Sequence, residues 1–172
     1  MLGEWEMDAR AQRIVWEDRE FQDVQFTGSM NQRRGRASLD VVRDESEQYS
    51  VAGEFALDSV GGEIRVADVR AVLDETTWAL SFPAMLTWDA QSFTVDRLNV
   101  HPEGDESMWL TVEGSLTGVG ESNFRLDMER FPIQQAMRIA QWEDADVSGI
   151  VDLRLSVLGS SDNPIIDAFF EV

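Results

Sequence analysis

The side chains that most often carry out chemistry are sparse in this sequence. His101 is the only histidine, and cysteine is absent, which excludes a thiolate nucleophile, a disulfide and a zinc site with cysteine ligands. A lone histidine could serve a metal site or a catalytic triad, but each of these needs partners. No serine stands in a nucleophile-elbow context that would pair with it. The composition of residues 101–106 is typical of a hairpin tip, so we interpret His101 as a solvated loop residue.

Carboxylates are abundant but carry no distinctive spacing. Three acidic clusters, at 44–47, 103–106 and 143–146, could bind calcium through oxygen ligands, yet none has the spacing of an EF-hand loop. Among 33 acidic residues, no pair is distinguished as the two carboxylates of a glycoside hydrolase. Residues 118–120 read Gly-Val-Gly between two predicted strands, which favours a turn over a nucleotide-binding loop. We therefore expect no catalytic residues, no metal, no cofactor and no enzymatic activity.

The elements that would position any site are strands. Apolar residues alternate with polar ones along most of the chain, and the clearest alternation is Met108, Leu110, Val112, Gly114 and Leu116. Shorter alternations precede it, such as Trp5 with Met7 and Phe55 with Leu57. The pattern predicts an antiparallel sheet with one apolar face and one face exposed to water.

Turn residues separate the predicted strands. We place turns at Gly28-Ser29 together with 31–35, at 43–47 and at 59–62. Proline cannot donate a hydrogen bond to a sheet, so Pro83 should mark the end of a strand or a bulge. The apolar alternation slips by one residue at Asp96-Arg97, which predicts a β-bulge.

One short helix interrupts the strands. Pro132 suits the first helical position, and Ile133, Ala136, Met137 and Ala140 follow with the spacing of one helical face, which predicts about two turns near 132–141. After the acidic 143–146 segment the period returns to two, and the turn residues 159–164 precede a last predicted strand, 165–172.

Composition narrows the possible partners. The chain has 172 residues, all 14 basic residues are arginine, and the net charge is −19. Nucleic acid and anionic membrane surfaces attract basic residues, so both are poor partners for this chain. No segment approaches the roughly 20 apolar residues of a membrane span, and the first residues lack the features of a signal peptide.

The order of these elements resembles the end of a repeat in the TamB/AsmA-like envelope proteins. The segments that carry the resemblance are FPIQQAMRIA, SGIVDLRLSVLG and DNP in the C-terminal part, and the order of strands agrees from Trp88 onward. The resemblance implies a mainly β fold in which a long, curved antiparallel sheet forms an open apolar groove. It also implies that residues 1–172 are a single groove segment excised from a larger repeat-containing protein of the translocation and assembly module type.

This resemblance further implies a function in lipid transport or outer membrane biogenesis, including protein secretion. The segment would lie in the periplasm and shield phospholipid acyl chains, or nascent outer-membrane polypeptide, between the two membranes. The intact protein would be anchored in the inner membrane by a preceding N-terminal part and could contact an outer-membrane barrel assembly partner. The expected groove-lining residues are Trp78, Leu80, Phe82, Phe93, Val95, Met108, Leu110, Val112, Leu116, Phe124, Leu126, Met128, Val151, Leu153, Leu155 and Val157.

A second architecture is compatible with the same alternation. A closed β-sandwich or jelly-roll binding module of unknown ligand would also have strands with one apolar face. The two hypotheses differ in the state of that face, because a sandwich buries it and a groove leaves it partly open.

Overall fold

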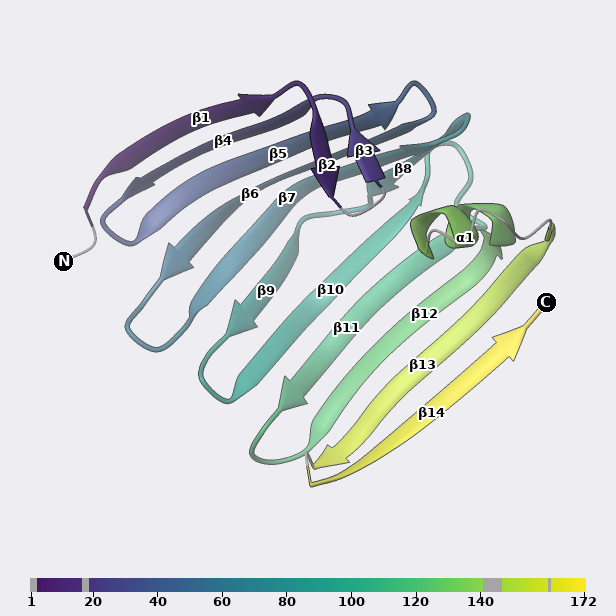
Figure 1. The fold of residues 1–172 in the computed structure, drawn as a ribbon. Helices are drawn as coiled ribbons and strands as arrows, with labels where there is room; N and C mark the ends of the chain where they lie inside the picture. Colours follow the sequence, from purple (N-terminus) through teal and green to yellow (C-terminus); the bar gives the residue numbers. More distant parts are fainter. Residues whose placement is uncertain (1–2, 17–18, 141–146, 161) are drawn as a thin grey trace.

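A computed structural model of the chain describes residues 3–16, 19–140, 147–160 and 162–172. These residues form fourteen strands and one helix (Figure 1). The strands are β1 (Trp5–Ala11), β2 (Ile14–Trp16), β3 (Arg19–Phe21), β4 (Val24–Asn31), β5 (Arg34–Asp44), β6 (Glu47–Leu57), β7 (Gly62–Leu73), β8 (Thr76–Leu80), β9 (Ala84–Trp88), β10 (Ser92–Pro102), β11 (Trp109–Thr117), β12 (Ser122–Pro132), β13 (Ile150–Ser160) and β14 (Asn163–Glu171).

Twelve of the strands belong to one antiparallel sheet. Its order is β1-β4-β5-β6-β7-β8-β10-β11-β12-β13-β14, and β9 continues β8 by pairing with β7 and β10. The strands β2 and β3 form a separate hairpin. The predicted mainly β antiparallel fold is therefore confirmed. The closed sandwich is wrong for this part of the chain, because the two-stranded sheet is far too small to cover a twelve-stranded one.

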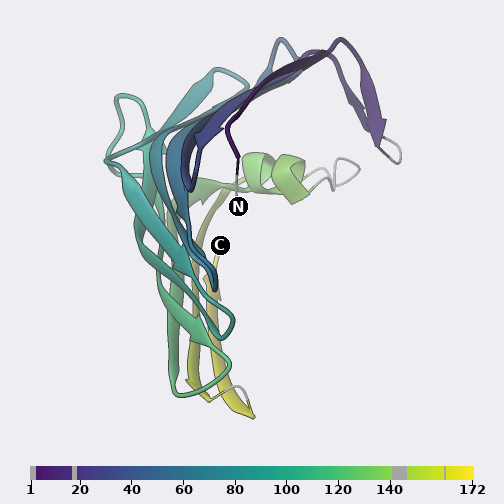
Figure 2. The ribbon, with the colours of Figure 1, turned by 90° about the vertical axis from the view of Figure 1, so that its left-hand side faces the viewer.

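The sheet is curved and open. Seen from the side, its strands bend toward the face on which helix α1 (Ile133–Ala140) lies, and the β2–β3 hairpin projects on that same side (Figure 2). The strands β1 and β14 form the two edges and do not pair with each other, so the sheet does not close into a barrel. The side that carries α1 is therefore the concave side of the sheet, and we call this concave side the groove (Figure 2).

Irregularities in the strand pairing accompany this curvature. The register between β10 and β11 shifts between Val95 and Leu98, which confirms the bulge predicted at Asp96-Arg97. Further shifts occur in the pairs β6–β7 and β12–β13. An extra residue on one strand bends and twists that strand locally, so the bulges are a physical source of the bend. Pro83 lies between β8 and β9, as predicted for a residue that ends a strand.

Two predictions about local structure are wrong. Gly28 and Ser29 are not in a turn but lie inside β4, and the turn follows at Gln32, whose φ is 58°. A Cβ at Gly28 would lie 3.0 Å from the rings of Phe26 and Trp5, so this glycine leaves room for the two rings. His101 is in strand β10 and half-buried, with Nδ1 3.0 Å from the carbonyl oxygen of Pro102.

The predicted helix is confirmed as α1. It packs through Ile133 against a cluster of buried side chains, and the indole Nε1–H of Trp78 donates a hydrogen bond of 2.7 Å to Oε1 of the buried Gln135. The acidic cluster at 143–146 lies outside the described residues. The members of the buried cluster are Leu73, Trp78, Phe131, Ile133 and Val151.

Candidate apolar binding groove

Strand register places the apolar residues of the sheet on a single face. Residues directly opposite one another on paired strands share a face, so the pairings trace rows across the sheet. One such row contains only apolar residues and glycine from edge to edge. It consists of Trp5, Met30, Gly35, Phe55, Ile64, Leu86, Val95, Gly114, Phe124, Val157 and Ile166.

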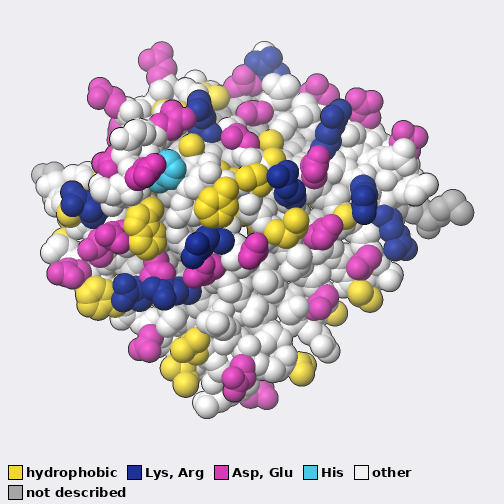
Figure 3. Space-filling view, turned by 180° about the vertical axis from the view of Figure 1, so that it is seen from behind, with side chains coloured by type: hydrophobic (Ala, Val, Ile, Leu, Met, Phe, Trp, Pro, Cys, Tyr) yellow, Lys and Arg dark blue, Asp and Glu magenta, His cyan; other side chains and the backbone are white. Residues whose placement is uncertain are grey.

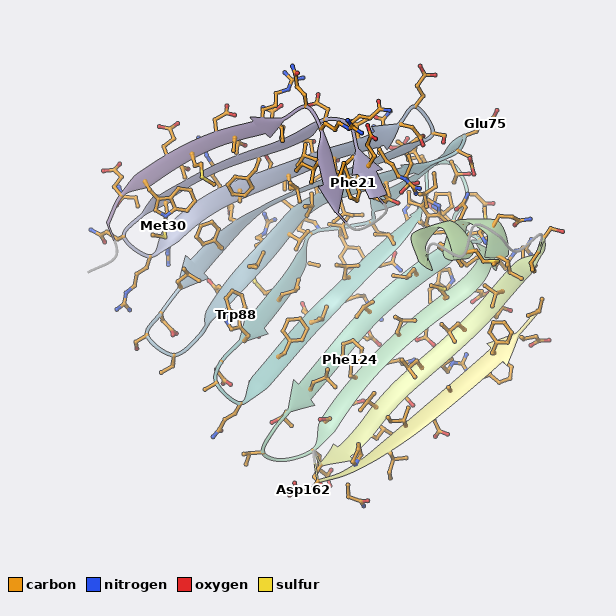
Figure 4. The ribbon with its side chains drawn as sticks, viewed as in Figure 1. Phe21, Met30, Glu75, Trp88, Phe124 and Asp162 are labelled. Atoms are coloured by element: carbon orange, nitrogen blue, oxygen red, sulfur yellow. The ribbon has the colours of Figure 1, made fainter. Side chains whose placement is uncertain are left out.

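This row follows the long dimension of the groove. It crosses eleven strands, and neighbouring strands lie about 4.8 Å apart, so the row is roughly 50 Å long. Figure 4 shows Trp88 and Phe124 on the face turned toward the viewer, which is also the face that carries α1. The apolar face is therefore the inner face of the bend.

The structure brings the predicted lining residues onto this face with one exception. Phe82 lies in the bend between β8 and β9, where 45% of it is exposed. It borders a hollow together with Asn99 and Thr111, which form a cross-strand pair on the opposite face. Phe82 is therefore wrong as a groove residue: β8 ends at Leu80, so the alternation of Trp78 and Leu80 does not extend to it.

Sequence reasoning missed the groove residues of the N-terminal strands and of β14. Trp5, Met30, Phe55 and Ile64 belong to the same row as the predicted residues, as does Ile166 at the other edge. The signal that could have found them is the same alternation of apolar and polar residues, which is present in these segments too.

On the inner face, the two ends of the strands differ in how they are covered. At one end α1 lies over the sheet, and we call the residues beneath it the capped end: Leu73, Trp78, Phe131 and Val151, which are 1%, 4%, 3% and 5% exposed. The other end, which we call the open end, contains Trp88, Phe93, Leu116 and Phe124, and none of these is buried. Phe93 and Leu116 are 38% and 37% exposed.

Glycines allow aromatic rings to lie against the floor of the groove. A Cβ at Gly35 would come within 2.4 Å of the Phe55 ring on the next strand. A Cβ at Gly62 would come within 2.7 Å of the indole of Trp88, its cross-strand partner. Each ring thus covers the backbone of a neighbouring glycine, so the floor remains apolar where the strand has no side chain.

A carboxylate is buried on the apolar face. Register places Glu47 opposite Leu73 at the capped end, and Glu47 is only 6% exposed. Its Oε2 accepts a hydrogen bond of 2.9 Å from Nη1 of Arg43, and its Oε1 accepts one of 2.8 Å from the hydroxyl of Tyr49. Both oxygens are satisfied, so the burial of Glu47 leaves neither of its oxygens unpaired at the capped end.

The outer face is polar and charged. Viewed from behind, acidic and basic side chains are distributed over the surface, with only scattered apolar side chains between them (Figure 3). Ion pairs link its strands, for example Arg97 Nε to Glu113 Oε2 at 3.0 Å, and Asp127 bonds both Arg125 and Arg154. Most of the arginine side chains in these pairs are exposed, whereas Asp127 is buried between its two partners, so this face suits contact with water.

Apart from the apolar face, the described residues offer no metal site or membrane-spanning helix from which a function could be argued. They contain no group of three or more histidine, cysteine, aspartate or glutamate side chains that could hold a metal ion. Helix α1, the one helix among them, falls short of the length and apolarity needed to cross a bilayer. A hollow of about 790 Å³ borders β1 and β4–β7, but its lining mixes arginine with glutamate and has no consistent charge.

Comparison with known proteins does not assign the chain to a family. No protein-family model, no curated protein and no solved structure matches it. The groove itself is therefore the feature from which a function can be argued.

Proposed function

We propose that the chain binds lipid acyl chains along its inner apolar face, as a non-enzymatic groove that shields them from water. The observation that carries the proposal is the uninterrupted apolar row from Trp5 to Ile166 on a face covered at one end only. Soluble proteins rarely leave a large apolar surface exposed unless it binds an apolar partner.

The dimensions suit this ligand. The hydrocarbon core of a bilayer is about 30 Å thick, so one leaflet's acyl chain reaches roughly 15 Å. A groove of roughly 50 Å could hold about three such chains end to end. Each methylene removed from water contributes about 0.8 kcal/mol, so a single chain would gain roughly 10 kcal/mol before the cost of ordering it.

An acyl chain fits the groove better than a polypeptide does. A peptide backbone must keep its N–H and C=O groups hydrogen-bonded, and burying one without a partner costs at least about 1 kcal/mol. The open end offers only apolar side chains, such as Phe93 and Leu116, to a ligand lying on it. An acyl chain has no such groups and avoids this cost.

This function agrees with the expected place of the chain in the cell envelope. A groove with a water-exposed outer face could move phospholipid through the periplasm between an inner-membrane anchor and an outer-membrane partner, as the resemblance to TamB/AsmA-like proteins implies. The charge of −19 would reduce adsorption to anionic membrane surfaces, so the groove could release its lipid without remaining bound to the bilayer.

The proposal is tested by what the protein retains on purification. Native mass spectrometry after gentle extraction should show phospholipid bound to the wild-type chain. The double variant Phe93→Glu/Leu116→Glu should lose it, while Asn123→Glu, on the outer face, should retain it. A wild-type chain free of lipid that also ignores added fluorescent fatty acid would exclude the function.

A further inference from the structure

Strand β14 exposes large apolar side chains on both of its faces. On the inner face, Ile166 and Phe170 are each 64% exposed. On the outer face, where neighbouring strands carry mostly polar side chains, Ile165 and Phe169 are 56% and 53% exposed, and Leu158 opposite Ile165 is 39% exposed. Strands that are apolar on both faces are typical of the interior of a sheet, not of its edge.

The outer edge of β14 is also available for pairing. Among the described residues β14 pairs only with β13, and that register runs from Asn163 to Glu171 without a bulge. It contains no lysine, and its one proline, Pro164, is near its start. Natural edge strands usually use lysine, proline or bulges to prevent pairing, and β14 lacks these features along most of its length.

We infer that β14 pairs with β14 of a second copy of this chain to form a twofold dimer. The direction of the two edge strands favours this arrangement over pairing between β14 and the other edge strand, β1. The two edge strands run the same way (Figure 1), so a copy placed side by side would meet β14 with a parallel β1. A twofold axis perpendicular to the sheet instead makes the new pair antiparallel, like every other pair in this sheet.

Side-chain chemistry selects a register for the pair. Only registers that keep the inner faces on one side are compatible with the amphipathic sheet. Placing Asp167 on the twofold axis would set two carboxylates directly opposite each other, which is destabilising. Placing Ala168 on the axis instead sets Ile166 opposite the partner's Phe170, and Asp167 opposite the partner's Phe169. This register joins the two apolar faces and keeps carboxylates from pairing directly.

The high net charge predicts how the dimer responds to salt. Two chains of charge −19 repel each other at long range, and raising the salt from 0.1 M to 1 M shortens the screening length from about 10 Å to about 3 Å. The apolar contacts between the two β14 strands do not depend on such screening. The dimer should therefore form at lower protein concentration in 1 M salt.

The absence of cysteine permits a direct test with lipid-free protein. The variant Ala168→Cys should form a covalent dimer on mild oxidation, because the two sulfurs would meet at the axis. The matched variant Ala9→Cys, on the inner face of the other edge strand β1, should remain monomeric. Equal cross-linking of both variants, or of neither, would overturn the inference.

Sedimentation across a concentration series supplies a second test. The wild-type chain should dimerise, and Ala168→Lys should raise the dissociation constant roughly tenfold or more by opposing two ammonium groups at the axis. Ala168 is exposed, so this change should leave the monomer's thermal midpoint unchanged. A wild-type chain that is monomeric at the highest soluble concentration in both salts would contradict the dimer. So would a dimer unaffected by Ala168→Lys. Neither result bears on lipid binding.

Discussion

The capped and open ends of the strands belong to one continuous apolar inner face but differ in what covers it. At the capped end, the rings of Trp78 and Phe131 pack beneath α1 with their centroids 4.7 Å apart and their planes tilted by 32°. At the open end, Phe93 and Leu116 lie side by side on paired strands with more than a third of each exposed. The first arrangement is a hydrophobic core and the second is a surface that can accept a ligand.

This comparison separates stability from binding. Together with Ile133 of α1, the capped end contains five of the nine buried apolar residues of the described chain, so it should contribute much of the sheet's stability. The open end gains little from folding because its side chains remain in contact with water. If that is correct, substitutions at the two ends should affect different measurements.

The largest difference is expected from removing large side chains. Phe131→Ala at the capped end should lower the free energy of unfolding by about 3–5 kcal/mol, because it leaves a cavity in a buried cluster. Phe93→Ala at the open end should lower it by about 1 kcal/mol or less, since its ring is already partly hydrated. Chemical denaturation of both variants is the measurement. Equal losses would show that the two ends are covered alike.

A charge on the inner face should give a similar contrast. Val151→Asp would bury an unpaired carboxylate beneath α1 and should cost several kcal/mol, or raise the pKa of the new group. Val112→Asp, on the partly open floor, should cost clearly less and mainly weaken the binding of a fluorescent fatty acid. Thermal melts and lipid titrations distinguish the two effects. Loss of folding in both variants would show that the floor at Val112 is covered as fully as the capped end.

The bond between helix and sheet offers a smaller test. Gln135→Leu removes the acceptor for the buried indole N–H of Trp78 and should cost about 1–3 kcal/mol. The neighbouring Gln134 is exposed, so Gln134→Leu is the matched control and should change stability little. If the bond holds α1 in place, the fluorescence of Trp78 should also become more solvent-like in Gln135→Leu alone.

The smallest effect is expected from removing a carboxylate in a turn, and it should be the same at the capped and the open end. Asp89, between β9 and β10, and Asp105, between β10 and β11, each accept backbone N–H bonds, from Gln91 and Ser107 respectively. Hydrogen bonds donated by the backbone N–H of Gln91 and by the hydroxyl and N–H of Ser92 lower the pKa of Asp89 below its usual 3.8. Bonds donated by the hydroxyl and N–H of Ser107 lower the pKa of Asp105 in the same way.

The sign of the pH dependence follows from these lowered values. A carboxylate whose folded-state pKa is lowered stabilises the protein above its unfolded pKa, and this contribution is lost as the pH falls through the folded value. Asp89→Asn and Asp105→Asn should therefore each reduce the loss of stability below about pH 4, by similar amounts. Urea melts between pH 5 and pH 2.5 would measure this loss of stability in the wild-type chain and in each variant. A large difference between the two variants would mean that the ends differ in their turns as well as in their cover.

Much of the groove could be predicted because alternation is a local signal. Leu110, Val112 and Leu116 face the groove because successive strand residues point to opposite sides. The prediction failed at Phe82, where Pro83 ends the alternation early, and at Gly28, where the glycine makes room for the Trp5 ring. Both failures depend on a neighbouring element and not on the local pattern.

The openness of the groove could not be predicted from alternation. A sandwich and a groove require the same pattern along each strand, and they differ in strand order and curvature. Bulges such as that at Asp96-Arg97 can be read from sequence, but the direction in which they bend the sheet depends on all the paired strands. The sequence predicted that α1 is a helix but not that it covers the sheet. Its partners Leu73 and Trp78 are distant in sequence, so local patterns could not reveal this contact.

The most direct test of the central claim compares two adjacent residues on opposite faces of β11. Single-cysteine variants Leu116→Cys and Ser115→Cys, each labelled with an environment-sensitive fluorophore, report on the inner and the outer face respectively. On addition of fatty acid or phospholipid vesicles, the label at 116 should shift to shorter wavelength and the label at 115 should not change. Equal shifts at both positions, or no shift at 116, would contradict a groove that binds acyl chains on its inner face.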